Sequence, residues 1–166
     1  MSSPDDAVPA ADGAVTFRDA RRADVPQIVA LLADDVLGAR REAPAGAGGE
    51  LDDGYWAGFE QVEADPRSRI LVAEAGGHVV ATLQLTLIPG VSRHGLLRAQ
   101  VEAVRVAASH RSQGLGRALL ERAIAEARAA GCGLVQLTSD KRRSRAISFY
   151  ESLGFTATHE GLKLPL

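Results

Sequence analysis

The sequence predicts an α+β fold, or loosely an α/β fold, in which helices cover both faces of a mixed sheet. Three successive strand patterns separated by short turns indicate an antiparallel meander. A strand, a long amphipathic helix and another strand follow, and such a β-α-β unit joins parallel strands. The predicted order is β-α-α-β-β-β-α-β-α-β-β, without an internal repeat. This order does not match a doubly wound nucleotide-binding fold.

The first half of the chain supplies one strand and two helices. Alternating polarity over Val15–Arg18 is typical of a strand. Asp24-Val25-Pro26 begins the first helix, because Asp caps helix N-termini and Pro fits the first turn. A loop over Gly38–Glu50 precedes the second helix, which covers Asp52–Ala64. The packing residues are Ile28, Leu31 and Leu32 in the first helix and Tyr55, Trp56, Phe59 and Val62 in the second.

The second half supplies the meander and the β-α-β unit. Strands are predicted over Ile70–Glu74 and Val79–Ile88, around the turn Gly76-Gly77, and within Gly95–Val106. After a glycine-containing turn, a helix over Ala118–Ala130 ends at Gly131, a common C-terminal signal. The remaining predicted elements are a strand over Leu134–Thr138, a helix over Ser144–Leu153, and a hairpin of Phe155–Thr158 and Leu162–Leu164 around Glu160-Gly161.

Composition indicates one globular domain. The chain has 166 residues, 46% of them hydrophobic and 24% charged, and its formal net charge is −2. This charge argues against a general nucleic-acid binder, and no apolar run approaches the ~18–20 residues of a membrane span. The chain shows no signal-peptide pattern and has one cysteine, so we expect a cytoplasmic protein without intrachain disulfides. We expect residues 1–14 to form a disordered tail and residues 15–166 a single domain.

The stretch from Arg111 to Leu120 has the pattern of an anion site. It lies between a predicted strand and a predicted helix, and it contains two glycines, Gly114 and Gly116. Glycines let successive backbone N–H groups turn toward one point, and the helix N-terminus adds partial positive charge. The turn therefore predicts a site for a ligand that carries phosphate.

Two motifs make the chain similar to the GNAT superfamily of N-acetyltransferases, over roughly Thr16–Leu166. The pattern [Gln/Arg]-x-x-Gly-x-[Gly/Ala] is matched by Arg111, Gly114 and Gly116. The pattern Ala-Ile-x-Phe-Tyr-x-x-Leu-Gly-Phe is matched in full by residues 146–155. The resemblance implies a mostly antiparallel central sheet with splayed central strands, and the activity of an acetyl-CoA-dependent N-acetyltransferase.

The resemblance also implies how acetyl-CoA, the donor substrate, is held. Its pantetheine would follow the backbone of Val104, Arg105 and Val106, with the thioester near the middle of the strand Gln100–Val106. Its pyrophosphate would lie in the motif that begins with Arg111 and Ser112, against the amides of Gln113, Gly114, Leu115, Gly116, Arg117 and Ala118.

One position departs from the family pattern, because Arg143 stands where asparagine is common. It belongs to the basic segment Lys141–Arg145. This segment is expected either to bind CoA phosphates by charge-assisted hydrogen bonds or to form a solvated helix N-terminus. Cations are disfavoured at that end of a helix, so a CoA role needs compensation.

Acetyl transfer to an amine needs a base for the ammonium proton, a donor for the oxyanion and an acid for the departing thiolate. The resemblance gives Tyr150 the acid role, and a phenol with an ordinary pKa near ~10 is protonated at neutral pH. Glu102 is the candidate base, because strand alternation places it on the face of Val104. The backbone N–H near Val104 is the expected oxyanion donor. The alternatives without catalytic roles are that Tyr150 is a core residue and that Glu102 faces solvent.

The remaining candidates receive lesser roles. His94 is the alternative base, since an imidazole titrates near neutral pH. His78, His110 and His159 are expected on the surface, and no two histidines have a metal-ligand spacing, so no metal is predicted. Cys132 is expected to be a small buried hydrophobe and not an acyl-carrying nucleophile.

Together these observations predict direct acetyl transfer from acetyl-CoA to a primary amine in a ternary complex. A small-molecule acceptor is preferred, and the alternatives are a protein N-terminus or lysine as acceptor, or a non-catalytic acyl-CoA-binding module. Arg40, Arg41 and Glu42 lie in the loop where the family commonly selects acceptors. Neither a nucleic-acid nor a membrane partner is predicted. Homodimerisation is common in the family and stays open here.

Overall fold

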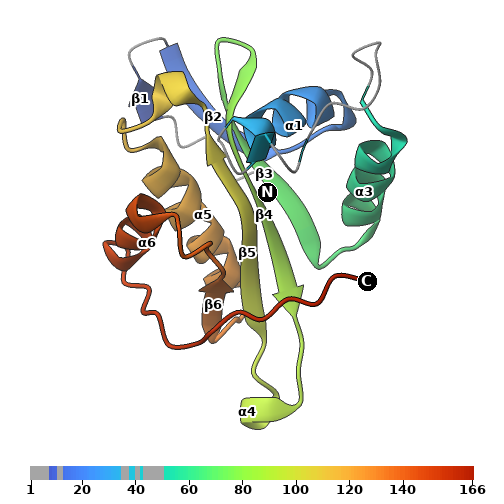
Figure 1. Ribbon diagram of the computed structural model, residues 1–166, viewed down its shortest axis with the longest axis vertical. Helices are drawn as coiled ribbons and strands as arrows, with labels where there is room; N and C mark the ends of the chain where they lie inside the picture. The colour runs from blue at the N-terminus through green and yellow to red at the C-terminus, as the bar shows by residue number, and fades with distance from the viewer. Residues whose placement is uncertain (1–7, 11–12, 35–37, 40–41, 43–50) are drawn as a thin grey trace.

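The computed structural model describes residues 8–10, 13–34, 38–39, 42 and 51–166. In this part of the chain, six strands form one sheet in chain order. Neighbouring strands are antiparallel except β5 and β6, which are parallel (Figure 1). The strands are β1 (Val8–Ala10), β2 (Gly13–Asp19), β3 (Ser68–Ala75), β4 (His78–Ile88), β5 (Arg98–Val106) and β6 (Leu134–Leu137).

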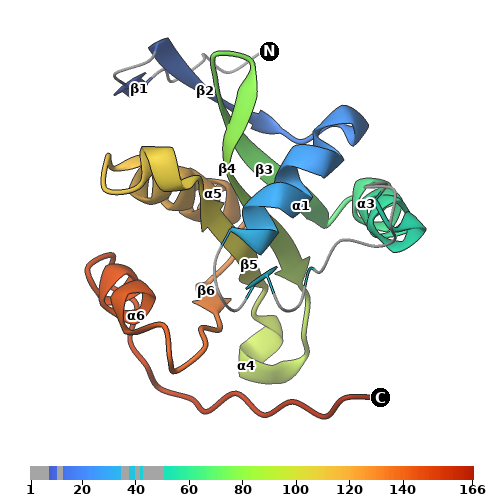
Figure 2. The same ribbon diagram turned by 45° about the horizontal axis from the view of Figure 1, so that its top comes forward.

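Helices cover both faces of this sheet. α1 (Val25–Ala33) and α3 (Asp53–Ala64) lie on one face, called here the front face, and α5 (Leu115–Ala129) lies on the other, the back face (Figure 2). α4 (Ser92–Gly95) forms the turn between β4 and β5, and α6 (Ser144–Glu151) follows β6 at the edge of the sheet. The predicted α+β fold with a mixed, mostly antiparallel sheet is confirmed.

The core on the back face holds α5 in place. Leu119, Leu120, Ala123 and Ala127 of α5 are completely buried and recur at helical spacing. They belong to one cluster with alternate residues of the strands, such as Leu71 of β3. Burying one leucine contributes about 1.5–3 kcal/mol. This packing fixes the position of the glycine turn, because the turn leads directly into α5.

β5 and β6 separate part of the way along their length. Their pairing ends at Val101↔Leu137, where β6 ends, whereas β5 continues to Val106. Ala103 has φ +55° and is an extra residue relative to β4, so β5 has a bulge at this point. Over residues 102–106, the β5 edge that faces away from β4 has no partner strand in the described part of the chain. The predicted splay of the central strands is confirmed.

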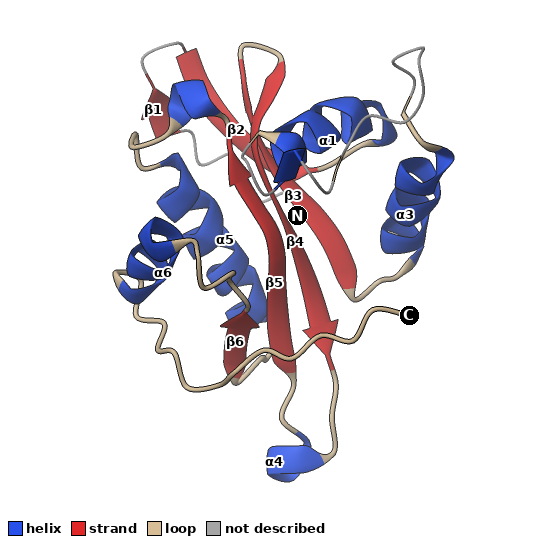
Figure 3. Cartoon of the chain, viewed as in Figure 1, coloured by secondary structure: helices blue, strands red, loops and turns tan. Residues whose placement is uncertain are grey.

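The predicted C-terminal hairpin of Phe155–Thr158 and Leu162–Leu164 is wrong. Residues 155–166 contain no strand and run as an extended segment past the ends of β6, β5 and β4 (Figure 3). Leu162 and Leu164 alternate as in a strand, but their exposed fractions are 94% and 83%, so the sheet does not cover them. A strand requires a hydrogen-bonded neighbour, which alternation in the sequence does not supply.

The expected tail also differs from the structure. Val8–Ala10 forms β1 and pairs with β2, which begins at Gly13, so part of residues 1–14 is a strand and not disordered. The free edge of β2 exposes backbone groups that a short antiparallel neighbour can bind. Residues 1–7 and 11–12 lie outside the described part, and the single domain over 15–166 stays a prediction.

Candidate active site

The glycine turn precedes α5, as predicted. Gly114 is the N-cap of α5 and has φ +82°, and Ser112 has φ +64°. Both values lie in the left-handed region, which glycine adopts without strain. The first amides of a helix have no partner inside the helix, so those of residues 114–117 are available to a ligand. With the helix dipole they fit a pyrophosphate.

The amide of Ala118 does not belong to this set. It donates to the Gly114 carbonyl at 3.0 Å, because Ala118 is the first residue of α5 whose N–H reaches a carbonyl one turn earlier. Its contact with pyrophosphate stays a prediction.

The side chain of Arg111 is bound within the protein. Its guanidinium donates to Asp34 Oδ2 at 2.6 Å, to the Asp34 carbonyl at 2.9 Å and to the Val106 carbonyl at 3.0 Å. Asp34 Oδ2 also accepts from the Ala108 N–H at 3.2 Å. These contacts fix the turn to the C-terminal end of α1. The geometry gives Arg111 a positioning role, and direct contact with the donor stays a prediction.

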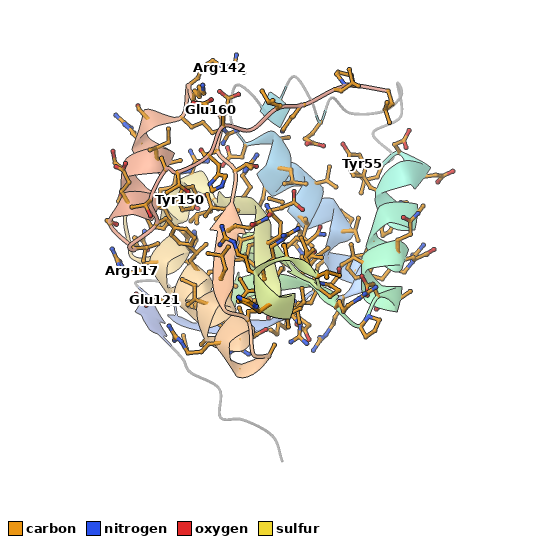
Figure 4. All side chains as sticks on the ribbon, turned by 90° about the horizontal axis from the view of Figure 1, so that it is seen from below. Tyr55, Arg117, Glu121, Arg142, Tyr150 and Glu160 are labelled. Carbon is orange, nitrogen blue, oxygen red and sulfur yellow. The ribbon has the colours of Figure 1, made fainter. Side chains whose placement is uncertain are left out.

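Gln113 and Arg117 are likewise held by neighbouring residues. Gln113 Nε2 donates to the Ser109 carbonyl at 3.0 Å, and Arg117 Nη2 donates to Ser152 Oγ at 3.0 Å. Arg117 also lies 3.5 Å from Glu121, one turn along α5 (Figure 4). Since Ser152 follows α6, Arg117 joins α5 to the helix that carries Tyr150.

Gly116 has a packing role that its motif does not reveal. A Cβ at this position would approach Val106 Cγ2 to 3.3 Å and Phe149 Cζ to 3.6 Å. The absence of a side chain therefore lets the turn, the end of β5 and α6 meet closely. Leu115 beside it is buried and anchors the first turn of α5 in the core.

The bulge changes which β5 side chains share a face. Val101 packs in the core of the back face, and beyond the bulge at Ala103 so does Val104. Glu102 pairs with Gln84 of β4, and its exposed side chain lies on the front face. The expectation that Glu102 and Val104 share a face is therefore wrong. One extra residue shifts the alternation of a strand by one position.

Tyr150 lies beside the splay, next to β5. Its ring packs against Phe149 and Phe155, with centroid distances of 5.3 Å and 6.0 Å. Burial raises the pKa of its hydroxyl above the ordinary value, although the charges of Arg105 and Arg143 act in the opposite direction. Tyr150 therefore keeps its proton at neutral pH. No residue in the described part is hydrogen-bonded to this hydroxyl, so it is available to a ligand.

The basic segment before α6 is partly neutralised by carboxylates. Lys141 Nζ lies 2.5 Å from Glu160, and Arg142 Nη2 lies 2.7 Å from Asp140 (Figure 4). These pairs compensate the cations near the N-terminus of α6. Arg143 is the N-cap of α6, and its charge acts on Tyr150. Contact between Arg143 and CoA stays a prediction.

The histidines lie away from the splay or are bound to neighbours. His94, the alternative base, has φ +59° on α4, at the end of β5 opposite the glycine turn (Figure 1). His78 and His159 are exposed, as predicted, and His110 is half-buried, with Nδ1 2.9 Å from Ser109 Oγ. None of these positions or contacts puts one of the four histidines beside Glu102.

The thiol of Cys132 is not activated. Burial raises its pKa, which lowers the fraction of nucleophilic thiolate. In the part of the chain that the structure describes, no group of three or more His, Cys, Asp or Glu residues is arranged to hold a metal ion. No helix of this part is long and apolar enough to cross a membrane.

The front face carries a polar row that the sequence did not reveal. Ser68, Thr86, Gln100 and Gln136 are partners in register on β3, β4, β5 and β6. Gln136 Nε2 donates to Gln100 Oε1 at 2.7 Å, and Ser68 Oγ donates to Thr86 Oγ1 at 3.3 Å. Only strand register brings these distant residues together, and no spacing in the sequence signals it.

The second helix contributes packing residues, as predicted. Phe59 is buried, Trp56 lies under Arg22 at 4.5 Å, and Tyr55 Oη donates to Glu42 at 2.9 Å. Figure 4 shows Tyr55 on α3 and Tyr150 on α6 at opposite sides of the sheet. Glu42 thus borders the front face through Tyr55. The expected acceptor residues Arg40 and Arg41 lie outside the described residues.

A pocket of about 1030 Å³ opens between α1, the turn from β3 to β4, and residues 107–110. Its lining includes Leu31, Val79 and His110 but neither Glu102 nor Tyr150. This pocket therefore does not contain the two candidate catalytic residues.

Comparisons with known proteins agree with this geometry. The sequence profile of the Acetyltransferase (GNAT) family matches residues 33–155. A glucosamine 6-phosphate N-acetyltransferase from Trypanosoma brucei brucei is 31% identical over 138 residues, which are 80% of this chain and 86% of that protein.

Two solved structures share the fold. A transcriptional regulator from Bacillus halodurans C-125 has a TM-score of 0.86 and 42% identity, over 92% of this chain and 99% of that one. An acetyltransferase from Trypanosoma brucei has a TM-score of 0.73 and 27% identity, again over 92% and 99%. With the family profile spanning both sequence motifs, this chain belongs to the GNAT family and is an acetyl-CoA-dependent N-acetyltransferase.

Proposed function

We propose that this enzyme acetylates the primary amine of a small molecule, by direct attack in a ternary complex with acetyl-CoA. The observation that carries the proposal is the splay between β5 and β6. The splay would connect the proposed anion site at the N-terminus of α5 with two side chains suited to proton transfer, Glu102 and Tyr150.

The chain's backbone would hold the donor. Acetyl-CoA supplies an activated acetyl group. The amides of residues 114–117 are free to bind its pyrophosphate, and the side chain of Arg111 keeps that turn in place. The edge of β5 that faces away from β4 would align the amides of pantetheine along Val104 to Val106, where the Val104 and Val106 carbonyls already accept from Arg105 and Arg111. The N–H near Val104 is the proposed oxyanion donor.

Two side chains would move the protons. The carboxylate of Glu102 is exposed on the front face and takes the ammonium proton, directly or through a water. The hydroxyl of Tyr150 is protonated and has no hydrogen-bond partner among the described residues, so it donates to the departing thiolate. The nitrogen would lose two protons, one to Glu102 before attack and a second as the amide forms, and the second restores the proton that Tyr150 gives to the thiolate as the C–S bond breaks.

A small acceptor is supported by a relative and by the front face. The Trypanosoma brucei brucei relative is named for glucosamine 6-phosphate, which is a small amine. The polar row through Gln100 and Gln136 offers hydrogen bonds to a hydroxylated molecule. Glucosamine 6-phosphate is therefore the first acceptor to test.

The proposal is tested by measuring thiol release from acetyl-CoA with a panel of small amines and of lysine-containing or free-N-terminal peptides. Tyr150→Phe and Glu102→Gln should each lower kcat about 100-fold, the size of general acid–base effects. Tyr55→Phe removes the chain's other tyrosine hydroxyl and should leave kcat unchanged. Turnover with peptides alone would contradict a small-molecule acceptor. CoA binding without turnover on any acceptor would indicate a non-catalytic module.

A further inference from the structure

Arg98 is a cation on the front face whose side chain lacks a carboxylate partner among the described residues. Its residue is half-buried, and its Nε is buried without a hydrogen-bond partner. Its partners in register are Ile88 of β4 and Leu134 of β6, both apolar. A buried donor without an acceptor is unfavourable, and apolar neighbours strengthen any charge interaction made there. An anion would satisfy the side chain of Arg98, and none of the described residues supplies one.

Arg98 lies in line with Gln100 and Glu102 on β5. The residues between them, Ala99 and Val101, are buried in the core of the back face, so these three side chains share the front face. The α-carbons of Arg98 and Glu102 lie four positions apart, or about 13 Å along a strand. A cation, an amide and a carboxylate thus follow one another along the strand.

The amide in the middle is oriented by its neighbour. Gln100 Oε1 accepts from Gln136 Nε2 at 2.7 Å, which leaves the amino group of Gln100 as a donor. No hydrogen bond of this amino group to another described residue is present. The centre of the row can therefore donate to a hydroxyl or carbonyl of a ligand.

We infer that Arg98 is a specificity-determining residue that binds an oxyanion of the acceptor, a phosphate or a carboxylate, while the amine lies at Glu102. This inference rests on the proposed function. The guanidinium fork matches the oxygens of either anion, and Glu102 attracts the ammonium. The acceptor is therefore an amine whose acidic group is several bonds away from the nitrogen. Arg98 disfavours polycationic amines by like-charge repulsion.

The test is calorimetric titration of the CoA-bound enzyme with two matched pairs of ligands. Glucosamine 6-phosphate is compared with glucosamine, and 6-aminohexanoate with hexylamine. In at least one pair, the wild type should bind the member with the acidic group 10-fold or more tightly than the member without it. A preference in the first pair indicates that Arg98 binds a phosphate, and a preference in the second pair indicates that it binds a carboxylate.

Arg98→Gln should remove the preference and leave the binding of the member without an acidic group unchanged, whereas Arg98→Lys should keep part of the preference. Arg93→Gln removes the same charge from the exposed turn α4 and should keep all of it. Equal wild-type affinities within both pairs, or equal effects of Arg98→Gln and Arg93→Gln, would overturn the inference. Because the readout is binding, an Arg98-dependent preference without acetyl transfer would refute only the proposed function.

Discussion

Replacing Gly114 by alanine tests whether the left-handed conformation of the turn creates the anion site. Gly114 has φ +82° and ψ −8°, and a Cβ built there meets nothing within 4 Å. The substitution therefore adds backbone strain without a clash. An L-residue in this region costs about 1–2 kcal/mol.

This strain should appear as weaker CoA binding. In the free Gly114→Ala protein, the backbone at position 114 can relieve the strain by rotating to negative φ. The amides of residues 114–117 then no longer point toward one site. CoA must then restore the bound conformation, and 1–2 kcal/mol corresponds to about 5- to 30-fold weaker binding. Calorimetric titration with CoA measures this change.

Gly131 provides a matched control at the other end of α5. It has the same φ of +82°, and a Cβ there also meets nothing within 4 Å. Gly131→Ala should lower Tm by about 2–8 °C, the equivalent of 1–2 kcal/mol in a domain of this size, with wild-type CoA affinity. Wild-type CoA affinity in Gly114→Ala, or the same loss in both variants, would refute the reasoning.

Three further outcomes follow from individual side chains. Burial raises the pKa of the Tyr150 hydroxyl, so deprotonation of Tyr150 should not lower kcat at any pH below about 10. A decline in the pH profile of kcat with a midpoint below this value, absent in Tyr150→Phe, would contradict this. The hydrogen bond from Arg18, 2.6 Å long, holds the pKa of Asp24 below its ordinary value, so its stabilisation exists above about pH 4 and is lost as pH falls through the folded-state pKa. Urea unfolding of Asp24→Asn should show a deficit of about 1–3 kcal/mol at pH 7 that narrows in acid, and a constant deficit would argue against the ion pair. Cys132→Ala should keep kcat, and mass spectrometry should find no acetylated wild-type enzyme after acetyl-CoA treatment; an acetyl adduct on Cys132 would reverse its assignment.

Local signals predicted most of the secondary structure and the glycine turn before α5. α5 follows Gly114 and ends before Gly131 because glycine alone adopts positive φ without strain at both ends. The spacing of the apolar residues in α5, which places Leu119 and Leu120 in the core, can also be read from the sequence. The position of Tyr150 followed from its motif, and the structure places it beside β5.

The acceptor side could not be predicted in the same way, because it depends on contacts between distant segments. Alternation placed Glu102 on the face of Val104, but the bulge at Ala103 separates them. On the donor side too, the motif did not reveal that the guanidinium of Arg111 binds Asp34 at the end of α1. A bulge and a salt bridge between elements leave no periodic trace in the sequence.

By itself, the sequence determined the family, the order of the main elements from β2 to α6 and the conformation of the glycine turn, since each depends on residues close together in the chain. Only the tertiary structure decided which side chains meet on the front face. Arg98, Gln100 and Gln136 share that face because of strand register and the parallel pairing of β5 with β6. Backbone hydrogen bonds between strands far apart in sequence set this register, and a shift of one residue would turn every side chain to the opposite face.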